Sequence, residues 1–204
     1  LAFINKPMGN KSLNYLYKNG VYIEISKNEL KKEISKYMPN YIMKNSLVSN
    51  ITELVMLSNS NSNISFEGRE NIINFKNGLY DVKTKKLKPH TKNYTNLIQI
   101  NANYKDNPIN KGYWDKFIDD LTLGREELKL IIQEWFGLVI SNYNGALVKR
   151  IFILYGKGDT GKSKVINVLT SLLNEKNTKS IAIQNFEDRF SLSSLNYTRL
   201  VFSY

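Results

Sequence analysis

The sequence has no cysteine and only one histidine among its 204 residues. Without cysteine, neither a disulfide framework nor a thiolate metal site can form. His90 has no carboxylate cluster around it at ligand spacing, so we interpret it as structural rather than as a metal ligand or an acid–base catalyst. No apolar run is long enough to cross a bilayer, and no signal peptide is recognisable. These absences favour a soluble cytoplasmic protein with no membrane partner.

Acidic residues are also few. Lys and Arg total 29 against 18 Asp and Glu, which leaves a formal charge of +11. A basic surplus of this size favours a polyanionic partner such as DNA, although a Lys-, Asn- and Ile-rich composition can also arise from codon bias. The apolar content of 42% is enough for a real core, and the length accommodates one full domain and part of a second.

The most informative segment is an octapeptide that fits the phosphate-binding loop (P-loop) pattern. A β-branched and aromatic run, residues 150–155, precedes it and predicts a buried strand, while apolar residues at helical spacing follow it. Glycines allow backbone N–H groups to surround a phosphate, and the start of the following helix favours the same anion. We therefore predict an ATP-binding site formed by Gly156, Lys157, Gly158, Asp159, Thr160, Gly161, Lys162 and Ser163.

Within this loop, Lys162 is expected to reach the β- and γ-phosphates, and the Ser163 hydroxyl to bind Mg²⁺. Asp159 is expected to point away from the triphosphate, and we identify no catalytic residue. Hydrolysis needs an acidic residue at the end of a later strand, but the candidate strands 181–183 and 200–202 do not end in a carboxylate. Few residues follow Ser163, and the chain begins with Leu1, so we expect an ATPase domain that is truncated, in a fragment of a longer protein.

Two hairpins and several helices are predicted before the loop. Lys-Asn-Gly turns at 18–20 and 76–78 each join two apolar segments, and Asn-Gly suits a tight primed turn. Helical spacing relates Leu30, Ile34 and Met38, and a strand is expected at 97–100. Residues 59–63 are typical of a loop or flexible linker. Two further sets of apolar residues at helical spacing predict helices with a core face: Leu47, Ile51, Leu54 and Val55 on one, and Trp114, Phe117, Ile118 and Leu121 on another.

A longer apolar helix is expected at 128–140, where Trp135 is interpreted as a core residue rather than a base-stacking one. The run of residues 83–88 holds four lysines, which form either a solvated charged loop or a phosphate-contacting site. The predicted fold class is therefore α/β. A mainly helical α+β domain with two hairpins would occupy residues 1–145, and the first part of a P-loop parallel sheet, truncated, residues 146–204.

Taken in order, these segments resemble the superfamily 3 helicase region, of the AAA+ class, in phage, plasmid and DNA-virus primase-helicases. Residues 75–84, followed by Leu87 and His90, are similar to that family's "N-G-x-x-D-x-x-T" block. Trp114, Phe117 and the helix at 128–138 are similar to its pre-ATPase helices. The P-loop and then residues 190–195 and 199–202 complete the resemblance, which departs from the usual loop at Lys157 and Asp159.

The resemblance implies a protein that forms a homohexameric ring around DNA and couples ATP hydrolysis to unwinding during replication of a phage or mobile element. It also implies acidic Mg²⁺ ligands just beyond Tyr204, a primase domain before Leu1, and a location in the cytoplasm of a bacterial or host cell. This chain itself is then expected to be deficient in hydrolysis.

Two alternatives remain open. A small-molecule kinase or GTPase would also contain a P-loop, but little chain remains for an acceptor site and there is no Asn-Lys-x-Asp guanine signature. A non-enzymatic basic module for DNA binding or oligomerisation, carrying an inert P-loop, is the other. DNA binding that is indifferent to ATP would favour that module.

Overall fold

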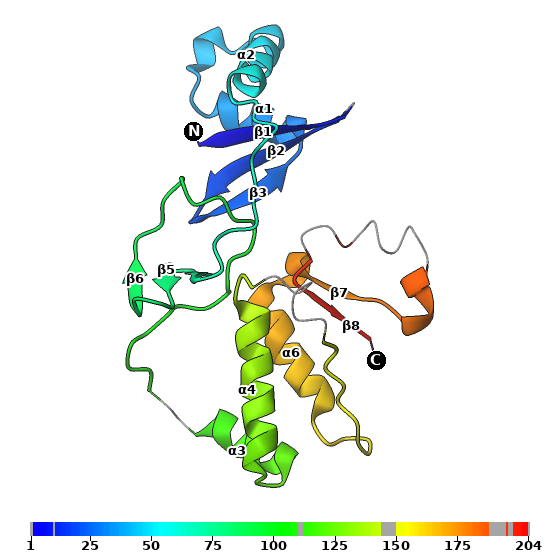
Figure 1. The fold of residues 1–204 in the computed structure, drawn as a ribbon. Coiled ribbons are helices and arrows are strands. Elements are labelled where there is room, and N and C mark those ends of the chain that lie inside the picture. Colours follow the sequence, from blue (N-terminus) through cyan, green and yellow to red (C-terminus); the bar gives the residue numbers. More distant parts are fainter. Residues whose placement is uncertain are drawn as a thin grey trace. The chain divides into compact units, whose positions relative to one another are not determined.

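The computed structural model describes residues 2–9, 11–109, 112–143, 150–187, 195 and 198–203. The chain divides into two compact units, one formed by residues 1–67 with 91–97 and the other by 68–90 with 98–204. The described residues are of mixed α/β type, with two antiparallel sheets and five α-helices (Figure 1). The division near residue 145 and the truncated P-loop sheet stay predictions.

The first unit contains a three-stranded antiparallel sheet in the order β1 (Phe3–Met8), β2 (Lys11–Lys18) and β3 (Val21–Ile25). The predicted first hairpin is confirmed: Lys18 pairs with Val21, and the turn residues Asn19 and Gly20 have φ angles of 49° and 87°. Positive φ at both positions is what a primed two-residue turn requires. The strand β1 escaped prediction because it holds Asn, Lys and Pro, which an edge strand tolerates.

Two helices accompany this sheet. Helix α1 (Lys27–Ser35) begins with a capping box between Ser26 and Glu29 and buries Leu30 and Ile34, as predicted. A short 3₁₀ turn, η1 (Asn40–Ile42), leads to α2 (Asn45–Ser58).

The predicted core face of α2 is partly wrong. Val48 and Thr52 are its buried residues, whereas Leu47 and Leu54 are exposed. Thr52 can occupy the buried face because its hydroxyl donates to the Val48 carbonyl at 2.7 Å. The pattern of apolar residues in the sequence could not show that this polar side chain forms a hydrogen bond within its own helix.

The Ser- and Asn-rich loop after α2 is attached to the sheet. The Asn5 N–H donates to the Asn59 carbonyl at 3.0 Å, and the Asn61 N–H donates to the Asn5 carbonyl at 2.8 Å. This segment therefore extends the edge of β1 by a bridge between Asn5 and Ser60. It is a loop, as predicted, and its backbone is hydrogen-bonded rather than free as in a flexible linker.

The second unit begins with the antiparallel strands β4 (Ile72–Phe75), β5 (Gly78–Asp81) and β6 (Lys86–Lys88). The second predicted hairpin exists, but Phe75 pairs with Gly78, so its two-residue turn is Lys76 and Asn77. Neither turn residue has a positive φ, so the two Lys-Asn-Gly segments do not share one turn chemistry. Gly78 is required for another reason: a Cβ there would lie 2.5 Å from the Lys88 carbonyl oxygen of β6.

The predicted strand at 97–100 is wrong, because within it the structure has only a single bridge between Phe75 and Ile100. The predicted helices are confirmed as α3 (Tyr113–Thr122), α4 (Glu126–Ile140) and, after the octapeptide, α6 (Lys162–Leu173). The predicted core face of α3 is partly wrong, because Ile118 is buried whereas Trp114 is exposed. Together α4, α6 and β8 enclose the core of this unit, whose buried members are Ile100, Val139, Leu169, Leu173 and Leu200.

The remaining elements are the 3₁₀ turns η2 (Glu175–Asn177) and η3 (Ile183–Glu187) and a parallel pair of strands, β7 (Thr178–Ser180) and β8 (Leu200–Phe202). The strand at 200–202 is confirmed, whereas the one expected at 181–183 lies at Thr178–Ser180 instead. Residues 190–194, part of the predicted family block, lie outside the described residues. In the described part of the chain, no helix combines the length and apolar character needed to cross a membrane.

Candidate nucleotide-binding site

The P-loop segment connects directly to α6, as the sequence predicted. Gly161 precedes the helix, and its carbonyl accepts hydrogen bonds from the N–H groups of Lys164 at 3.0 Å and Val165 at 3.3 Å. The helix is held in place by Val165, Leu169 and Leu173, which are almost fully buried. The N–H groups of Lys162 and Ser163 come before these bonds, have no acceptor within the helix and carry the positive end of the helix dipole. The start of α6 is thus a rigid platform suited to an anion.

Gly161 is the loop glycine that the backbone requires. Its φ is +92°, in the left-handed region, and a Cβ built on it would lie 2.9 Å from Cε2 of Phe117 on α3. Gly158 differs: a Cβ there would meet nothing within 4 Å, and its φ is not positive. Asp159 instead adopts the positive angle, with φ of 58°. Asn and Asp tolerate this conformation better than most residues, so Asp159 has a backbone role here.

The Lys162 ammonium folds back over the loop. Its Nζ donates to the Gly156 carbonyl at 3.1 Å, to the Thr160 hydroxyl at 3.1 Å and to the Lys157 carbonyl. The Thr160 hydroxyl in turn donates to the Lys157 carbonyl at 3.1 Å. An ammonium has three N–H donors, and the loop provides an acceptor for each. The loop is therefore closed around the one side chain that the pattern assigns to the phosphates.

Ser163 follows Lys162 in the first turn of α6 and is exposed. Its hydroxyl is accessible to a metal ion, but the described residues contain no cluster of three His, Asp or Glu side chains that could hold one. Ile181 follows β7 and Ser203 follows β8, so neither parallel strand is followed by a carboxylate. Lys162 could therefore contact a phosphate and Ser163 could contact Mg²⁺, but no acidic side chain among the described residues completes a metal site around them.

The predicted buried strand before the loop is wrong as a structural assignment. Residues 150–155 are not in a sheet, and Ile151, Ile153 and Tyr155 are 87%, 77% and 99% exposed. Phe152 anchors the segment, because its ring stacks on that of Trp135 of α4 with centroids 5.1 Å apart. Exposure alternates along the segment as in a strand, but in the described structure no neighbouring strand pairs with it.

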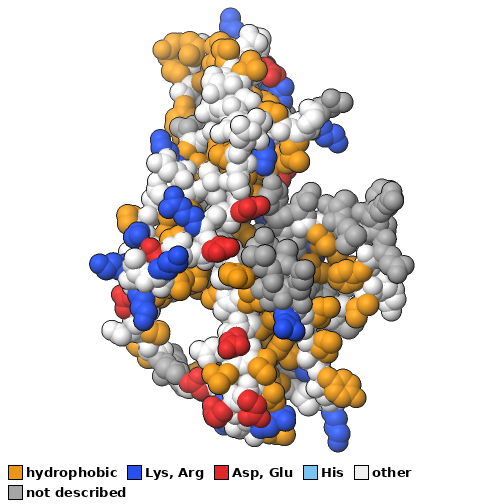
Figure 2. Space-filling view, in the orientation of Figure 1, with side chains coloured by type: hydrophobic (Ala, Val, Ile, Leu, Met, Phe, Trp, Pro, Cys, Tyr) orange, Lys and Arg blue, Asp and Glu red, His pale blue; other side chains and the backbone are white. Residues whose placement is uncertain are grey.

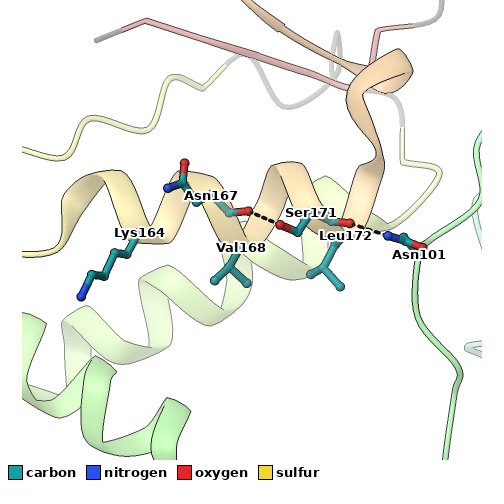
Figure 3. A pocket seen from close by; sticks show the side chains of 6 residues that line it. All are labelled: Asn101, Lys164, Asn167, Val168, Ser171 and Leu172. Carbon is teal, nitrogen blue, oxygen red and sulfur yellow. Dashed lines mark hydrogen bonds between the residues drawn. The ribbon is translucent and has the colours of Figure 1, made fainter.

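A shallow hollow of about 490 Å³ runs along α6, further from the loop. Figure 3 shows its lining residues on successive turns of this helix, with Asn101 at the far end. The Asn101 amide donates to the Ser171 carbonyl at 3.1 Å, and the Ser171 hydroxyl donates to the Asn167 carbonyl at 2.7 Å. The hollow includes Lys164 but not Lys162, so it is separate from the P-loop.

The block resembling "N-G-x-x-D-x-x-T" is a set of structural contacts. Asn77 exchanges hydrogen bonds with the backbone of Tyr104, at 2.8 and 2.9 Å, which explains the turn at this position. The Nε2 of His90 lies 2.8 Å from the Phe75 carbonyl oxygen and 3.1 Å from Oδ1 of Asn74. These contacts agree with the structural role expected of His90.

Asp81 is the centre of this block. Its carboxylate accepts from the N–H groups of Lys83 and Thr84 at 3.1 and 3.3 Å, from the Asn71 amide at 3.1 Å and from the Lys88 ammonium at 3.1 Å. Burial alone would raise the pKa of the Asp81 carboxyl, but the hydrogen bonds from Lys88, Asn71 and Thr84 outweigh it and hold the pKa well below its usual range. The ionised carboxylate therefore holds the turn between β5 and β6.

Sequence reasoning missed the role of Arg199. Its guanidinium donates to the carbonyls of Leu138 at 2.7 Å, Val139 at 2.9 Å and Tyr143 at 3.0 Å. Leu138 and Val139 lie in the last turn of α4, where carbonyls lack intrahelical donors, and Tyr143 lies just beyond the helix. Burial lowers the pKa of the Arg199 guanidinium. Only a basic residue just before a strand was visible in the sequence, and nothing there indicates a helix 60 residues away as its partner.

A family model described as "D5 N terminal like" matches residues 6–123, more than half of the chain. The matched residues extend from within β1 to the end of α3, so they include both antiparallel sheets but not the P-loop. No curated protein has significant sequence similarity to this chain.

Proposed function

Because the chain belongs to the D5 N-terminal-like family, the N-terminal region of D5-like primase-helicase proteins, we propose that it is a fragment of an ATP-dependent DNA helicase (primase-helicase) that unwinds DNA during replication of a phage or other mobile genetic element. Membership of this family indicates a replication protein related to primase-helicases. In this proposal, residues 156–163 bind Mg·ATP and the basic surface contacts DNA.

The observation that carries the nucleotide proposal is the position of the Lys162 ammonium. It lies inside the loop, against the carbonyls of Gly156 and Lys157, at the start of the 12-residue helix α6. An incoming phosphate would replace at least one of these oxygens as an acceptor, and the exchange favours the phosphate because its negative charge strengthens the hydrogen bond. The positive end of α6 adds to the attraction.

Ser163 would hold Mg²⁺ through its hydroxyl, and the metal would neutralise charge on the β- and γ-phosphates. The chain's own contribution is to bind and orient the triphosphate. Asp159 is exposed at the loop surface, which agrees with an orientation away from the phosphates. In the whole protein we propose a homohexameric ring around DNA, in which ATP hydrolysis drives unwinding.

Calorimetric titration of Mg·ATP into the chain tests the nucleotide proposal. We expect binding that weakens at least tenfold in Lys162→Ala, since one charge-assisted hydrogen bond is worth about 1.5 to 3 kcal/mol. Lys164→Ala is the matched control: it removes the same charge from the same helix, but lines the hollow rather than the loop. Equal affinities for the chain and for Lys162→Ala would refute the site.

A second candidate function is a non-enzymatic DNA-binding or assembly module with an inert P-loop. The absence of a carboxylate directly after the described strands β7 and β8 favours it, because hydrolysis needs an acidic residue near the metal. A hydrolysis assay on the same samples separates the two candidates. ATP binding without turnover would agree with a loop that binds but does not hydrolyse in this chain, whereas DNA binding without any nucleotide binding would favour the module.

A further inference from the structure

The turn from β5 to β6 carries an unusual density of positive charge. Four lysines, Lys83, Lys85, Lys86 and Lys88, occur within six residues, and all are exposed. In the space-filling view, Lys and Arg side chains gather around the position of these strands (Figure 2). A single carboxylate, that of Asp81, stands within the strands and turn that hold the four ammonium groups.

Asp81 neutralises only one of these lysines. Its Oδ2 pairs with Lys88 at 3.1 Å, while its Oδ1 is occupied by the backbone N–H groups of the turn. Within the described residues, no ion pair involves Lys83, Lys85 or Lys86. We call these three the hairpin lysines. No salt bridge with another described residue therefore compensates their charges.

The turn holds its shape independently of the hairpin lysine side chains. Asp81 fixes the backbone at Lys83 and Thr84 by hydrogen bonds, and Lys85 adopts a left-handed φ of 54° before β6 begins. A lysine gains nothing from that conformation by itself. The three ammonium groups are thus displayed from an ordered backbone, which reduces the entropy lost when they bind a partner.

On the hairpin formed by β5 and β6, the face opposite Asp81 offers no free aromatic ring for base stacking. Tyr80 points away from the Asp81 face because successive strand residues alternate. Its ring stacks on Tyr104 with centroids 4.1 Å apart, and Phe75 packs against the Tyr104 ring at 5.6 Å. The hairpin therefore presents cations rather than unpaired rings, which suits a sugar–phosphate backbone and not base edges.

We propose that the hairpin lysines form a contact for the phosphate backbone of DNA, separate from the P-loop. This inference rests on the proposed DNA partner, and it names the surface that contacts it. The contact is independent of base sequence. Each phosphate that a lysine neutralises releases condensed counterions, so these three residues contribute a definite part of the salt dependence of binding.

The test compares two variants of equal charge. One replaces Lys83, Lys85 and Lys86 by Gln; the control replaces Lys11, Lys32 and Lys44, exposed lysines in no salt bridge of the described structure, by Gln. Each variant loses three positive charges, so both have the same formal net charge, which is lower than the +11 of the unsubstituted chain. Fluorescence anisotropy with labelled single-stranded DNA and with duplex DNA measures affinity across about 50 to 200 mM salt. Circular dichroism verifies that both variants are folded.

We expect the slope of log affinity against log salt to become shallower by about 2 for single strands and about 2.7 for duplex in the hairpin variant, and far less in the control. Equal changes in both variants would mean that net charge, not the hairpin, attracts DNA, and would overturn the inference. So would DNA binding that the hairpin variant leaves unchanged, although the proposed DNA partner would then stand. If the unsubstituted chain binds neither single-stranded nor duplex DNA, both the hairpin inference and the proposed DNA partner are overturned. The proposed nucleotide site is tested separately, by calorimetry.

Discussion

Replacing Gly161 by Ala tests whether the geometry of the P-loop depends on the packing of α3 beneath it. Gly161 combines a left-handed φ of +92° with a close approach to Phe117, whose Cε2 would lie 2.9 Å from the new Cβ and Cζ 3.4 Å from it. Leu121 Cδ1 is also near, at 3.9 Å. Both the backbone conformation and the space therefore oppose a side chain at this position.

The expected loss of stability has two parts. A non-glycine residue in the left-handed region costs about 1 to 2 kcal/mol. The contact with the Phe117 ring adds up to about another 1 kcal/mol, because the ring edge must move by some tenths of an ångström. Phe117 has little freedom to do so, since its ring also packs against Trp114 with centroids 5.5 Å apart. We expect a total of about 1 to 3 kcal/mol.

Urea unfolding followed by tryptophan fluorescence measures this loss, because Trp114 and Trp135 both belong to the second unit. Gly158→Ala is the control, since a Cβ there meets no atom within 4 Å and the φ is not positive. We expect Gly158→Ala to be neutral or to stabilise by up to about 1 kcal/mol through the unfolded chain. Adding Phe117→Leu to Gly161→Ala should recover the steric part but not the backbone part.

The reasoning fails if Gly161→Ala and Gly158→Ala unfold at the same urea concentration. It also fails if Phe117→Leu removes the entire effect, because the left-handed φ would then carry no cost. A loss of Mg·ATP affinity in Gly161→Ala alone, without loss of stability, would mean that the proposed nucleotide site and not the fold requires this glycine.

Two further predictions concern buried contacts. The depressed pKa of Asp81 means that its contribution to stability is fully present above its unfolded pKa of about 3.9 and is lost as pH falls from there through its lower folded pKa. Chemical unfolding of the chain and of Asp81→Asn between neutral and acidic pH should therefore show a difference that shrinks below about pH 4; a constant difference would contradict this. Arg199→Ala should destabilise the second unit by about 2 to 4 kcal/mol, because three carbonyls at and just after the end of α4 lose the guanidinium as a donor, and Arg199→Lys should recover only part of it. Equal stability of Arg199→Ala and the unsubstituted chain, by urea unfolding, would refute this role.

The local elements were largely predictable because they depend on neighbours in sequence. Asn19-Gly20 supplies two positive φ angles between apolar segments, so the first hairpin follows from the turn residues alone. The helices α3, α4 and α6 follow from apolar residues at intervals of three and four. At Asn77 the same reasoning was wrong about the turn, because a hydrogen bond to the distant Tyr104 backbone, and not local preference, sets its conformation.

Predictions that depended on partners elsewhere in the chain were less successful. Residues 150–155 have the composition of a buried strand, but a strand forms only where another one pairs with it, and none does so in the described structure. The apolar side chains of α2 gave no sign that Thr52 rather than Leu54 would face the core. The composition of a segment indicates which secondary structure it can form, but whether a strand forms also depends on a second strand that pairs with it.

For the candidate site, the sequence by itself determined the helix that follows the loop and predicted Lys162 as the cation of the loop, because a short motif brings its own backbone groups and charge together. It also determined the positive charge of residues 83–88. Only the tertiary structure decided that Gly161 faces Phe117, that Asp81 pairs with Lys88 while the hairpin lysines form no ion pair with any described residue, and that Arg199 binds the end of α4. These contacts join residues far apart in the chain, and their energies depend on distances that no local pattern contains.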